Sequence, residues 1–235
     1  MNAMFKKFYP FLLITFALIP SFSLFSQTPP IQAERPDALE QYRRGRALED
    51  QNRLQEAETY YNEAVRICTD EIALDGGTRD SYTVLTWTLR RQRKYAEVIV
   101  WGERGLRLFG DDYRIVQTMG EAYFYQNDYD NSLRYMQRYI NSLPQGERAS
   151  VAYFFVGEIF RLQSKFRRAD IAYTTAVRLD PGMALWWYRL GTVREAIGDR
   201  PYAAEAYERA VRLNPNYADA VNGLERTRPA AISGQ

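Results

Sequence analysis

The chain has no histidine among its 235 residues and only one cysteine, Cys68. Histidine is the usual general base near neutral pH and the commonest metal ligand in proteins, so its absence counts against both kinds of chemistry. A single cysteine excludes an internal disulfide, and we interpret Cys68 as a buried, inert thiol. Lysine is also scarce: apart from Lys6, Lys7, Lys94 and Lys165, every basic residue is arginine. This reflects either compositional bias or a use for planar, bidentate contacts.

Other motifs for chemistry are missing as well. A net charge of +2 gives no basic field that would favour nucleic-acid binding. Gly76–Gly77 and the pair Gly102 and Gly105 lack the strand and the Lys-Ser/Thr pair that a phosphate-binding loop needs. Asp111–Asp112 and Asn127–Asp128 look like acid pairs, but each precedes an expected helix, so we interpret them as caps. We therefore predict no enzyme activity, no metal site and no cofactor.

Residues 1–26 have the composition of a secretory signal peptide. Two lysines precede an apolar run over residues 8–25, and small residues allow cleavage after Ser23 or Ser26. The alternative is an uncleaved anchor, since about 18 apolar residues barely span a bilayer. No cysteine lies near the cleavage region, which excludes a lipoprotein anchor. We predict an exported protein that is periplasmic or associated with the cell envelope.

Residues 150–183 and 184–217 match each other at an offset of 34 residues. Both stretches place an aromatic, an aliphatic and a glycine residue before an Ala, Tyr, Ala, Pro series. The matched pairs are Tyr153 and Trp187, Val156 and Leu190, Gly157 and Gly191, Ala169 and Ala203, Tyr173 and Tyr207, Ala176 and Ala210, and Pro181 and Pro215. Small residues let two helices approach, large ones fill the space between them, and proline ends the second helix. The pattern closely resembles the tetratricopeptide repeat (TPR), a helix–turn–helix unit.

Weaker copies of the pattern extend the resemblance over residues 38–228. It implies an all-α, right-handed superhelical solenoid of about five repeats with a C-terminal capping helix. The expected segments are a linker at 27–37 in which Asp37 caps the first helix, repeats at 38–71, 79–112, 113–146, 150–183 and 184–217, a cap at 218–228 and a flexible tail at 229–235. We also expect an inserted loop at 72–78 and a three-residue insertion at 147–149. In repeat 79–112, Gly102 occupies the slot of the large aromatic residue, so we expect looser packing there.

In the TPR family the first helices of the repeats line a concave groove. The resemblance implies that groove residues lie away from the packing stripe, about one helical turn apart. They are Tyr42 and Arg46; Thr83, Trp87, Arg90 and Arg91; Gln117, Glu121, Phe124 and Tyr125; Phe154, Glu158 and Arg161; and Tyr188 and Glu195. Aromatic and arginine side chains often carry binding energy. The alternative is that the rings pack on one another and the charges are only solvated.

The resemblance implies a function in protein–protein interaction. We expect an adaptor or scaffold that binds a peptide or helix of a partner protein in the groove, within the cell envelope. The alternative is a membrane-tethered subunit of a secretion or transport complex, held through residues 8–25. The run Arg90–Lys94 ends a first helix, where cations complement the helix dipole. It either serves that purpose as a solvated helix end or binds an acidic partner or lipid headgroups. A clamp for chaperone C-termini is unsupported, because Tyr42 and Arg46 occupy its first-repeat positions and groove asparagine is absent.

Overall fold

A computed structural model describes residues 37–228, and every regular element in that range is a helix. The helices are α1 (Ala38–Asp50), α2 (Leu54–Asp75), α3 (Arg79–Arg91), α4 (Tyr95–Phe109), α5 (Tyr113–Tyr125), α6 (Tyr129–Ser142), α7 (Ala149–Leu162), α8 (Phe166–Leu179), α9 (Ala184–Ala196), α10 (Arg200–Leu213) and α11 (Ala218–Thr227). The all-α, helix–turn–helix prediction is confirmed. The predicted signal peptide, most of the linker and the predicted tail lie outside the described residues.

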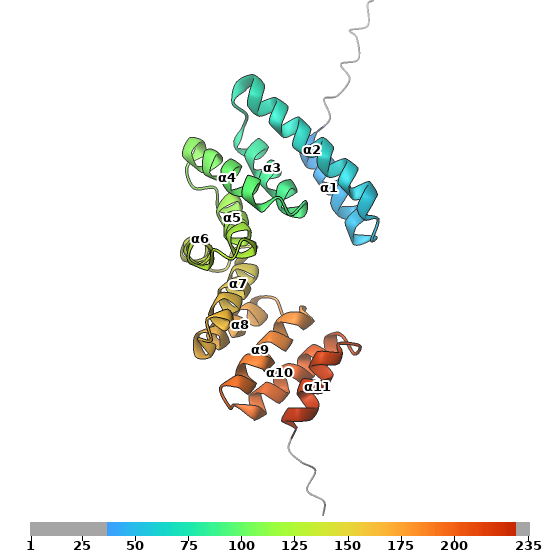
Figure 1. The fold of residues 1–235 in the computed structure, drawn as a ribbon, viewed down its shortest axis with the longest axis vertical. Helices are drawn as coiled ribbons and strands as arrows, with labels where there is room; N and C mark the ends of the chain where they lie inside the picture. Colours follow the sequence, from blue (N-terminus) through green and yellow to red (C-terminus); the bar gives the residue numbers. More distant parts are fainter. Residues whose placement is uncertain (1–36, 229–235) are drawn as a thin grey trace, which may run out of the picture. The chain divides into compact units, whose positions relative to one another are not determined.

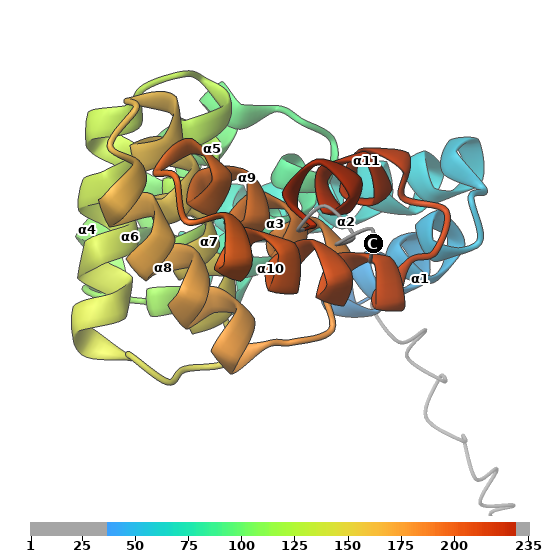
Figure 2. The ribbon, with the colours of Figure 1, turned by 90° about the horizontal axis from the view of Figure 1, so that it is seen from below.

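The helices form five pairs that follow one another in chain order, with α11 after the last pair (Figure 1). Each first helix packs on the second helix of its own pair, as α7 does on α8. First helices of successive pairs also pack together, at α1–α3, α3–α5, α5–α7 and α9–α11. Seen from below, the second helices α4, α6 and α8 lie beside one another, outside α5 and α7 (Figure 2). The first helices therefore form the inner wall of the array.

The turn inside each pair has the same backbone conformation. Asn52, Arg93, Asn127, Ser164 and Gly198 all have positive φ, and each lies two residues before the second helix of its pair. Four of these five are not glycine, although a side chain is disfavoured in this region. Arg93 and Asn127 are 34 residues apart, as are Ser164 and Gly198. The sequence period thus has a backbone counterpart in the turns.

Tyrosine rings packed against glycine hold the regular pairs together. Tyr173 and Tyr207 are fully buried. A Cβ added at Gly157 would lie 2.6 Å from the ring of Tyr173, and one at Gly191 would lie equally close to the ring of Tyr207. Tyr207 is also covered on another side by Gly223 of α11, where an added Cβ would again lie 2.6 Å from the ring. Only a residue without a side chain allows such close approach.

The expected loose packing at Gly102 is wrong. The side chain of Met119 on α5 fills the space that a tyrosine ring occupies in the regular pairs. A Cβ added at Gly102 would lie 2.6 Å from the Sδ atom of Met119, which is fully buried. Methionine fills irregular gaps well, because its unbranched side chain adapts its shape. The volume missing from one repeat is therefore supplied by the next repeat.

The expected inserted loop at 72–78 is also wrong over most of its length. Residues 72–75 continue α2, which ends only at Asp75, with Gly76 in the left-handed conformation as its C-cap. Ile72 is buried, so the apolar face of α2 extends beyond Cys68 by one more turn. Thr69 stands where proline follows the helix in the regular repeats, and nothing in the sequence stops the helix there. Ala149, the last of the three inserted residues at 147–149, is the first residue of α7.

Three of the predicted caps are confirmed. The carboxylates of Asp37, Asp112 and Asp128 accept hydrogen bonds from backbone N–H groups in the first turns of α1, α5 and α6. Asp111 is not the N-cap of α5, and its carboxylate forms an ion pair with Arg138. Asn127 occupies the turn before α6. Among the described helices, none combines the length and the apolar character that crossing a membrane requires.

Candidate functional site: a trough along α1 and α3

Two hollows meet on the inner wall near the start of the array. The first has a volume of about 690 Å³ and is lined by residues of α1, α3, α5, α6 and the loop before α7. The second has a volume of about 490 Å³ and is lined by residues of α1 and α3, the end of α2 and the start of α5. Both are lined by Leu39, Arg43, Trp87 and Arg114, so they are neighbours that share these four side chains. We call the two hollows together the α1–α3 trough.

Trp87 stands at the centre of this trough. It lies on α3, is half-buried, and lines both hollows. Its ring is supported by Tyr42 of α1, with 5.7 Å between the ring centroids, and Tyr42 packs in turn on Tyr61 at 6.2 Å. Both contacts are tilted, with interplanar angles of 35° and 39°, and they support one side of the indole while the half-buried ring still lines the hollows.

Arginine dominates the wall of the first hollow. Six arginines line it, against the two acids Asp50 and Glu147. Some of these arginines form ion pairs with acidic residues that do not themselves line the hollow. Arg91 donates to Glu49, with 3.4 Å between Nη1 and Oε1.

A buried carboxylate organises the far side of the first hollow. Glu121 on α5 is 3% exposed and accepts hydrogen bonds from Arg90 at 3.1 Å, Arg148 at 3.2 Å and the amide of Gln117. The backbone N–H of Arg148 donates to the hydroxyl of Tyr139 at 3.0 Å, which fixes the loop before α7. Two guanidinium groups thus share one carboxylate, and their remaining N–H donors are not used by it.

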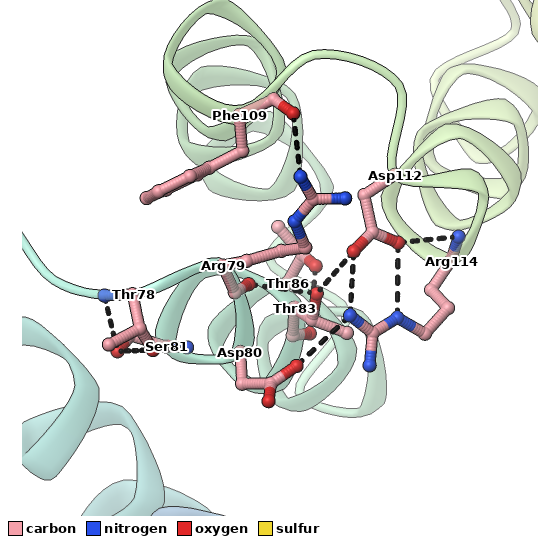
Figure 3. Close-up of polar contacts among 9 residues, drawn as sticks. All are labelled: Thr78, Arg79, Asp80, Ser81, Thr83, Thr86, Phe109, Asp112 and Arg114. Atoms are coloured by element: carbon pink, nitrogen blue, oxygen red, sulfur yellow. Dashed lines mark hydrogen bonds and ion pairs between the residues drawn. The ribbon is translucent and has the colours of Figure 1, made fainter.

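Thr83 and Arg114 line the second hollow, and both donate hydrogen bonds to the buried carboxylate of Asp112, which lies behind them (Figure 3). The Arg114 side chain donates to both oxygens of Asp112, at 3.1 and 2.6 Å, and pairs with Asp80 at 3.0 Å. Burial would raise the pKa of Asp112, but the hydrogen bonds and charge of Arg114 outweigh it and hold that pKa below its usual value. Thr83 is fully buried and donates to the carbonyl of Arg79 at 3.0 Å. Arg114 therefore joins the start of α5 to the start of α3.

Arginine–glutamate pairs join every successive pair of repeats along the inner wall, and they join the last repeat to α11. In each case the two residues come from consecutive first helices or from the residue that precedes one. The pairs are Glu49–Arg91 at 3.4 Å, Arg90–Glu121 at 3.1 Å, Glu121–Arg148 at 3.2 Å, Glu158–Arg189 at 3.1 Å and Glu195–Arg226 at 3.0 Å. Three of these glutamates also accept a hydrogen bond from a core tyrosine, from Tyr61, Tyr173 and Tyr207 in turn. The inner wall thus carries a ladder of ion pairs.

The structure brings seven of the predicted groove residues together in the trough. Tyr42, Arg46, Trp87, Arg90, Arg91 and Gln117 line the first hollow, and Thr83 lines the second. The remaining predicted residues line neither hollow. Glu121 is buried beneath Arg90 and Arg148, and Phe124, Tyr125, Phe154, Glu158, Arg161, Tyr188 and Glu195 lie further along the array. A role of any of these residues in binding stays a prediction.

The predicted groove residues that line neither hollow are either aromatic rings packed on other rings or charged side chains in ion pairs. Phe124 and Phe154 are half-buried and pack on Phe155 and on Trp186, with centroids 5.0 and 5.1 Å apart. Tyr125 is 50% exposed and stacks on Tyr95, and Tyr188 packs on Tyr217. Glu121 and Glu158 were expected to face the groove, but they are 3% and 7% exposed because two arginines cover each of them.

Sequence reasoning missed several residues of the trough. Arg43 lies one helical turn before Arg46 and lines both hollows, a spacing that the sequence displays. Tyr139 and Arg148 lie outside the first helices, on α6 and in the loop before α7, and helical geometry alone does not place them. In residues 37–228, no cluster of three or more His, Cys, Asp and Glu residues is arranged to hold a metal ion.

Family models described as tetratricopeptide repeat match residues 38–70, 118–146 and 157–218. The chain belongs to the tetratricopeptide repeat family. Solved TPR structures share the fold. YrrB, described as a TPR protein with an unusual peptide-binding site, is 20% identical, with a TM-score of 0.55 over 80% of this chain and 92% of its own. MamA is 17% identical, with a TM-score of 0.61 over 70% of this chain and 94% of its own.

Two curated relatives are much longer than this chain. Protein bimA of Emericella nidulans is 25% identical over 197 residues, which are 83% of this chain and 23% of that protein. The human protein O-mannosyl-transferase TMTC1 is 26% identical over 163 residues, which are 66% of this chain and 18% of that protein. The chain therefore spans less than a quarter of either relative, so the likeness carries over no activity of the whole relative.

Proposed function

We propose that this TPR array is an adaptor that holds a segment of a partner protein in the α1–α3 trough. The observation that carries the proposal is Trp87, which lies where the two hollows meet and rests on Tyr42. A partly exposed tryptophan supported by another ring is the kind of anchor on which binding energy concentrates. The peptide-binding site named for YrrB, a protein of the same fold, supports the same kind of ligand.

The test compares two tryptophan variants of the full chain in its native source. Trp87→Ala removes the centre of the trough, whereas Trp187→Ala removes a half-buried tryptophan of α9 that lines neither hollow. We expect a protein captured by the wild type to be lost with Trp87→Ala and retained with Trp187→Ala. Equal capture by wild type and Trp87→Ala, with both proteins folded, would place binding elsewhere.

We further propose that the adaptor acts in the cell envelope, after export directed by residues 1–26. The support is the basic start, apolar core and small residues of that segment. The alternative is a tethered subunit of a secretion or transport complex, in which residues 8–25 stay in the membrane. The mass of the mature protein separates the two: loss of residues 1–26 supports release, and their retention in the membrane fraction supports the tether. Recovery of the full chain in the cytoplasm contradicts both.

A further inference from the structure

Charge is sorted along the α1–α3 trough. The first hollow is lined by six arginines and two acids. The second hollow is lined by three acids, Asp37, Glu71 and Asp80, and by the two arginines that it shares with the first. One end of the trough is therefore rich in arginine and the other end is rich in carboxylates.

The direction of the two helices accounts for part of this sorting. Both α1 and α3 begin at the second hollow, where Asp37 and Asp80 stand at their N-termini. Both end at the first hollow, where α3 has Arg90 and Arg91 in its last turn. Acids are favoured at helix N-termini and bases at C-termini because of the helix dipole. The two N-termini act alike at the second hollow, whereas at the first hollow only α3 ends in bases: α1 has no basic residue in its last turn, and its Asp50 lines that hollow.

Several of these charged groups have bonding capacity left for a ligand. Arg43 and Arg46 are exposed, and neither lies within ion-pair distance of an acid among residues 37–228. Arg90 and Arg148 share the single carboxylate of Glu121. At the other end, the side chain of Asp80 is 77% exposed and meets Arg114 alone. Guanidinium groups with free donors suit carboxylates, and free carboxylates suit ammonium or guanidinium groups.

The length of the trough limits the ligand to a short segment. The trough follows α1, whose 13 residues span about 20 Å. An extended chain of about six residues covers that distance. Trp87 and Leu39 line both hollows, and they offer an apolar surface midway between the two charged ends.

We propose that the trough selects a partner segment by the order of its charges: acidic residues at one end, an apolar residue at the centre, and Lys or Arg at the other end. The acidic end lies in the first hollow, the apolar residue rests on Trp87, and the basic end lies beside Asp80. The segment therefore binds in one direction only. This inference rests on the proposed function, because it specifies the ligand of the same site.

The first experiment selects ligands from a random dodecapeptide library on the immobilised full chain, at low ionic strength where surface charges are least screened. We expect selected peptides to share the acid–apolar–base order. A fluorescent copy of one such peptide should bind at least tenfold more tightly than a peptide of the same composition with its sequence reversed. Replacement of its Asp and Glu by Asn and Gln should weaken binding by a similar factor.

The second experiment uses charge variants of the protein and that fluorescent peptide. The double variant Arg43→Gln/Arg46→Gln should weaken binding of this peptide at least tenfold. With this variant, replacing the peptide's Asp and Glu by Asn and Gln should weaken binding no further. Asp80→Asn should instead remove the penalty for losing its basic residues. The control is Arg178→Gln/Arg209→Gln, which removes two exposed arginines of α8 and α10 with the same change in net charge. Binding of the peptide to this control should be unchanged.

The direction is read by cross-linking. A photoreactive residue beside the acidic end of the peptide should label residues 46–50 or 113–118, and one beside the basic end should label residues 78–84. Peptides that bind without a common charge order, or equally well when reversed, overturn this inference and leave the proposed function standing. A selection that yields no binder to the trough overturns the proposed function itself, as does a trough occupied by a second copy of the chain.

Discussion

Arg90 of α3 donates to Glu121 of α5, with 3.1 Å between Nη1 and Oε2. Arg148, which precedes α7, reaches the other oxygen of the same carboxylate at 3.2 Å. Three successive repeats thus meet on one acid that is 3% exposed. In a stacked array each repeat contacts only its neighbours, so such junctions decide how stiffly one repeat follows the next.

The variant Glu121→Gln tests this junction. It leaves Arg90 and Arg148 facing an amide in a buried position, and breaking a buried pair on one side is costly. We expect a loss of about 2–4 kcal/mol in the free energy of unfolding, measured by urea denaturation. The matched control is Glu195→Gln, at the more exposed junction with Arg226, where the Glu195 side chain is 29% exposed; about 1 kcal/mol or less is expected. Equal losses for both variants would show that burial does not distinguish the junctions.

Gly157 tests the packing of the regular repeats. In the variant Gly157→Ala, the new Cβ would lie 2.6 Å from the ring of Tyr173, which is buried and has no room to move away. Overpacking of this kind costs about 1–3 kcal/mol, so the melting temperature should fall. Gly182→Ala is the control, because its Cβ meets nothing closer than 3.5 Å. If the two alanine variants have the same melting temperature, the tyrosine–glycine contact does not hold the helix pair together.

The regular part of the fold was predictable because a single local rule repeats. Glycine in the first helix and tyrosine in the second fit one another at Gly157 and Tyr173, and again at Gly191 and Tyr207. At a position that departs from this rule, the prediction from sequence was wrong. Gly102 predicted a gap, but Met119 from the next repeat fills it, and such compensation between repeats leaves no mark at the offset of 34 residues.

The candidate site was likewise predictable only in the part that follows the repeat. Helical spacing placed Tyr42, Arg46 and Trp87 on one surface, and the structure places all three on the first hollow. The period says nothing of segments outside the first helices, so Arg148 was missed although it lies in a segment that interrupts the period. The burial of charged residues could not be predicted from the repeat pattern either. Glu121 carries a charge, yet its arginine partners come from other repeats and cover it.

The turn at Ser164 predicts a gain in stability. Ser164 is exposed and has a φ of 57°, a region that costs a residue with a side chain about 1–2 kcal/mol. Ser164→Gly removes this cost and loses part of the gain to chain entropy, so we expect unfolding to become harder by about 0.5–1 kcal/mol. Ser164→Ala keeps the strain and should change stability by less than about 0.5 kcal/mol. A Gly variant no more stable than the Ala variant contradicts the assignment of strain to this turn.

The junction of Glu195 and Arg226 predicts a dependence on pH. The hydrogen bond from Arg226 lowers the pKa of Glu195 below its ordinary value of 4.5, and the hydroxyl of Tyr207 adds to the effect. A carboxylate with a lowered pKa stabilises the fold above its ordinary pKa, and that contribution is lost as the pH falls through the lowered value. The difference in melting temperature between wild type and Glu195→Gln should therefore be constant from pH 7 to 5 and shrink below pH 4.5. A difference that persists unchanged at pH 3 would show that the ionised form contributes nothing.

Cys68 provides a probe of opening in the first half of the array. Its thiol is fully buried, and burial raises its pKa to about 12. Only the thiolate reacts with iodoacetamide, so the folded protein should stay unlabelled at pH 8, while the urea-unfolded protein is labelled rapidly. The matched control is the double variant Cys68→Ser/Leu74→Cys, because position 74 is on the same helix and Leu74 is 82% exposed. Its thiol should react at once in the folded state. Labelling of native Cys68 as fast as the control would mean that α2 does not stay packed against α1 and α3.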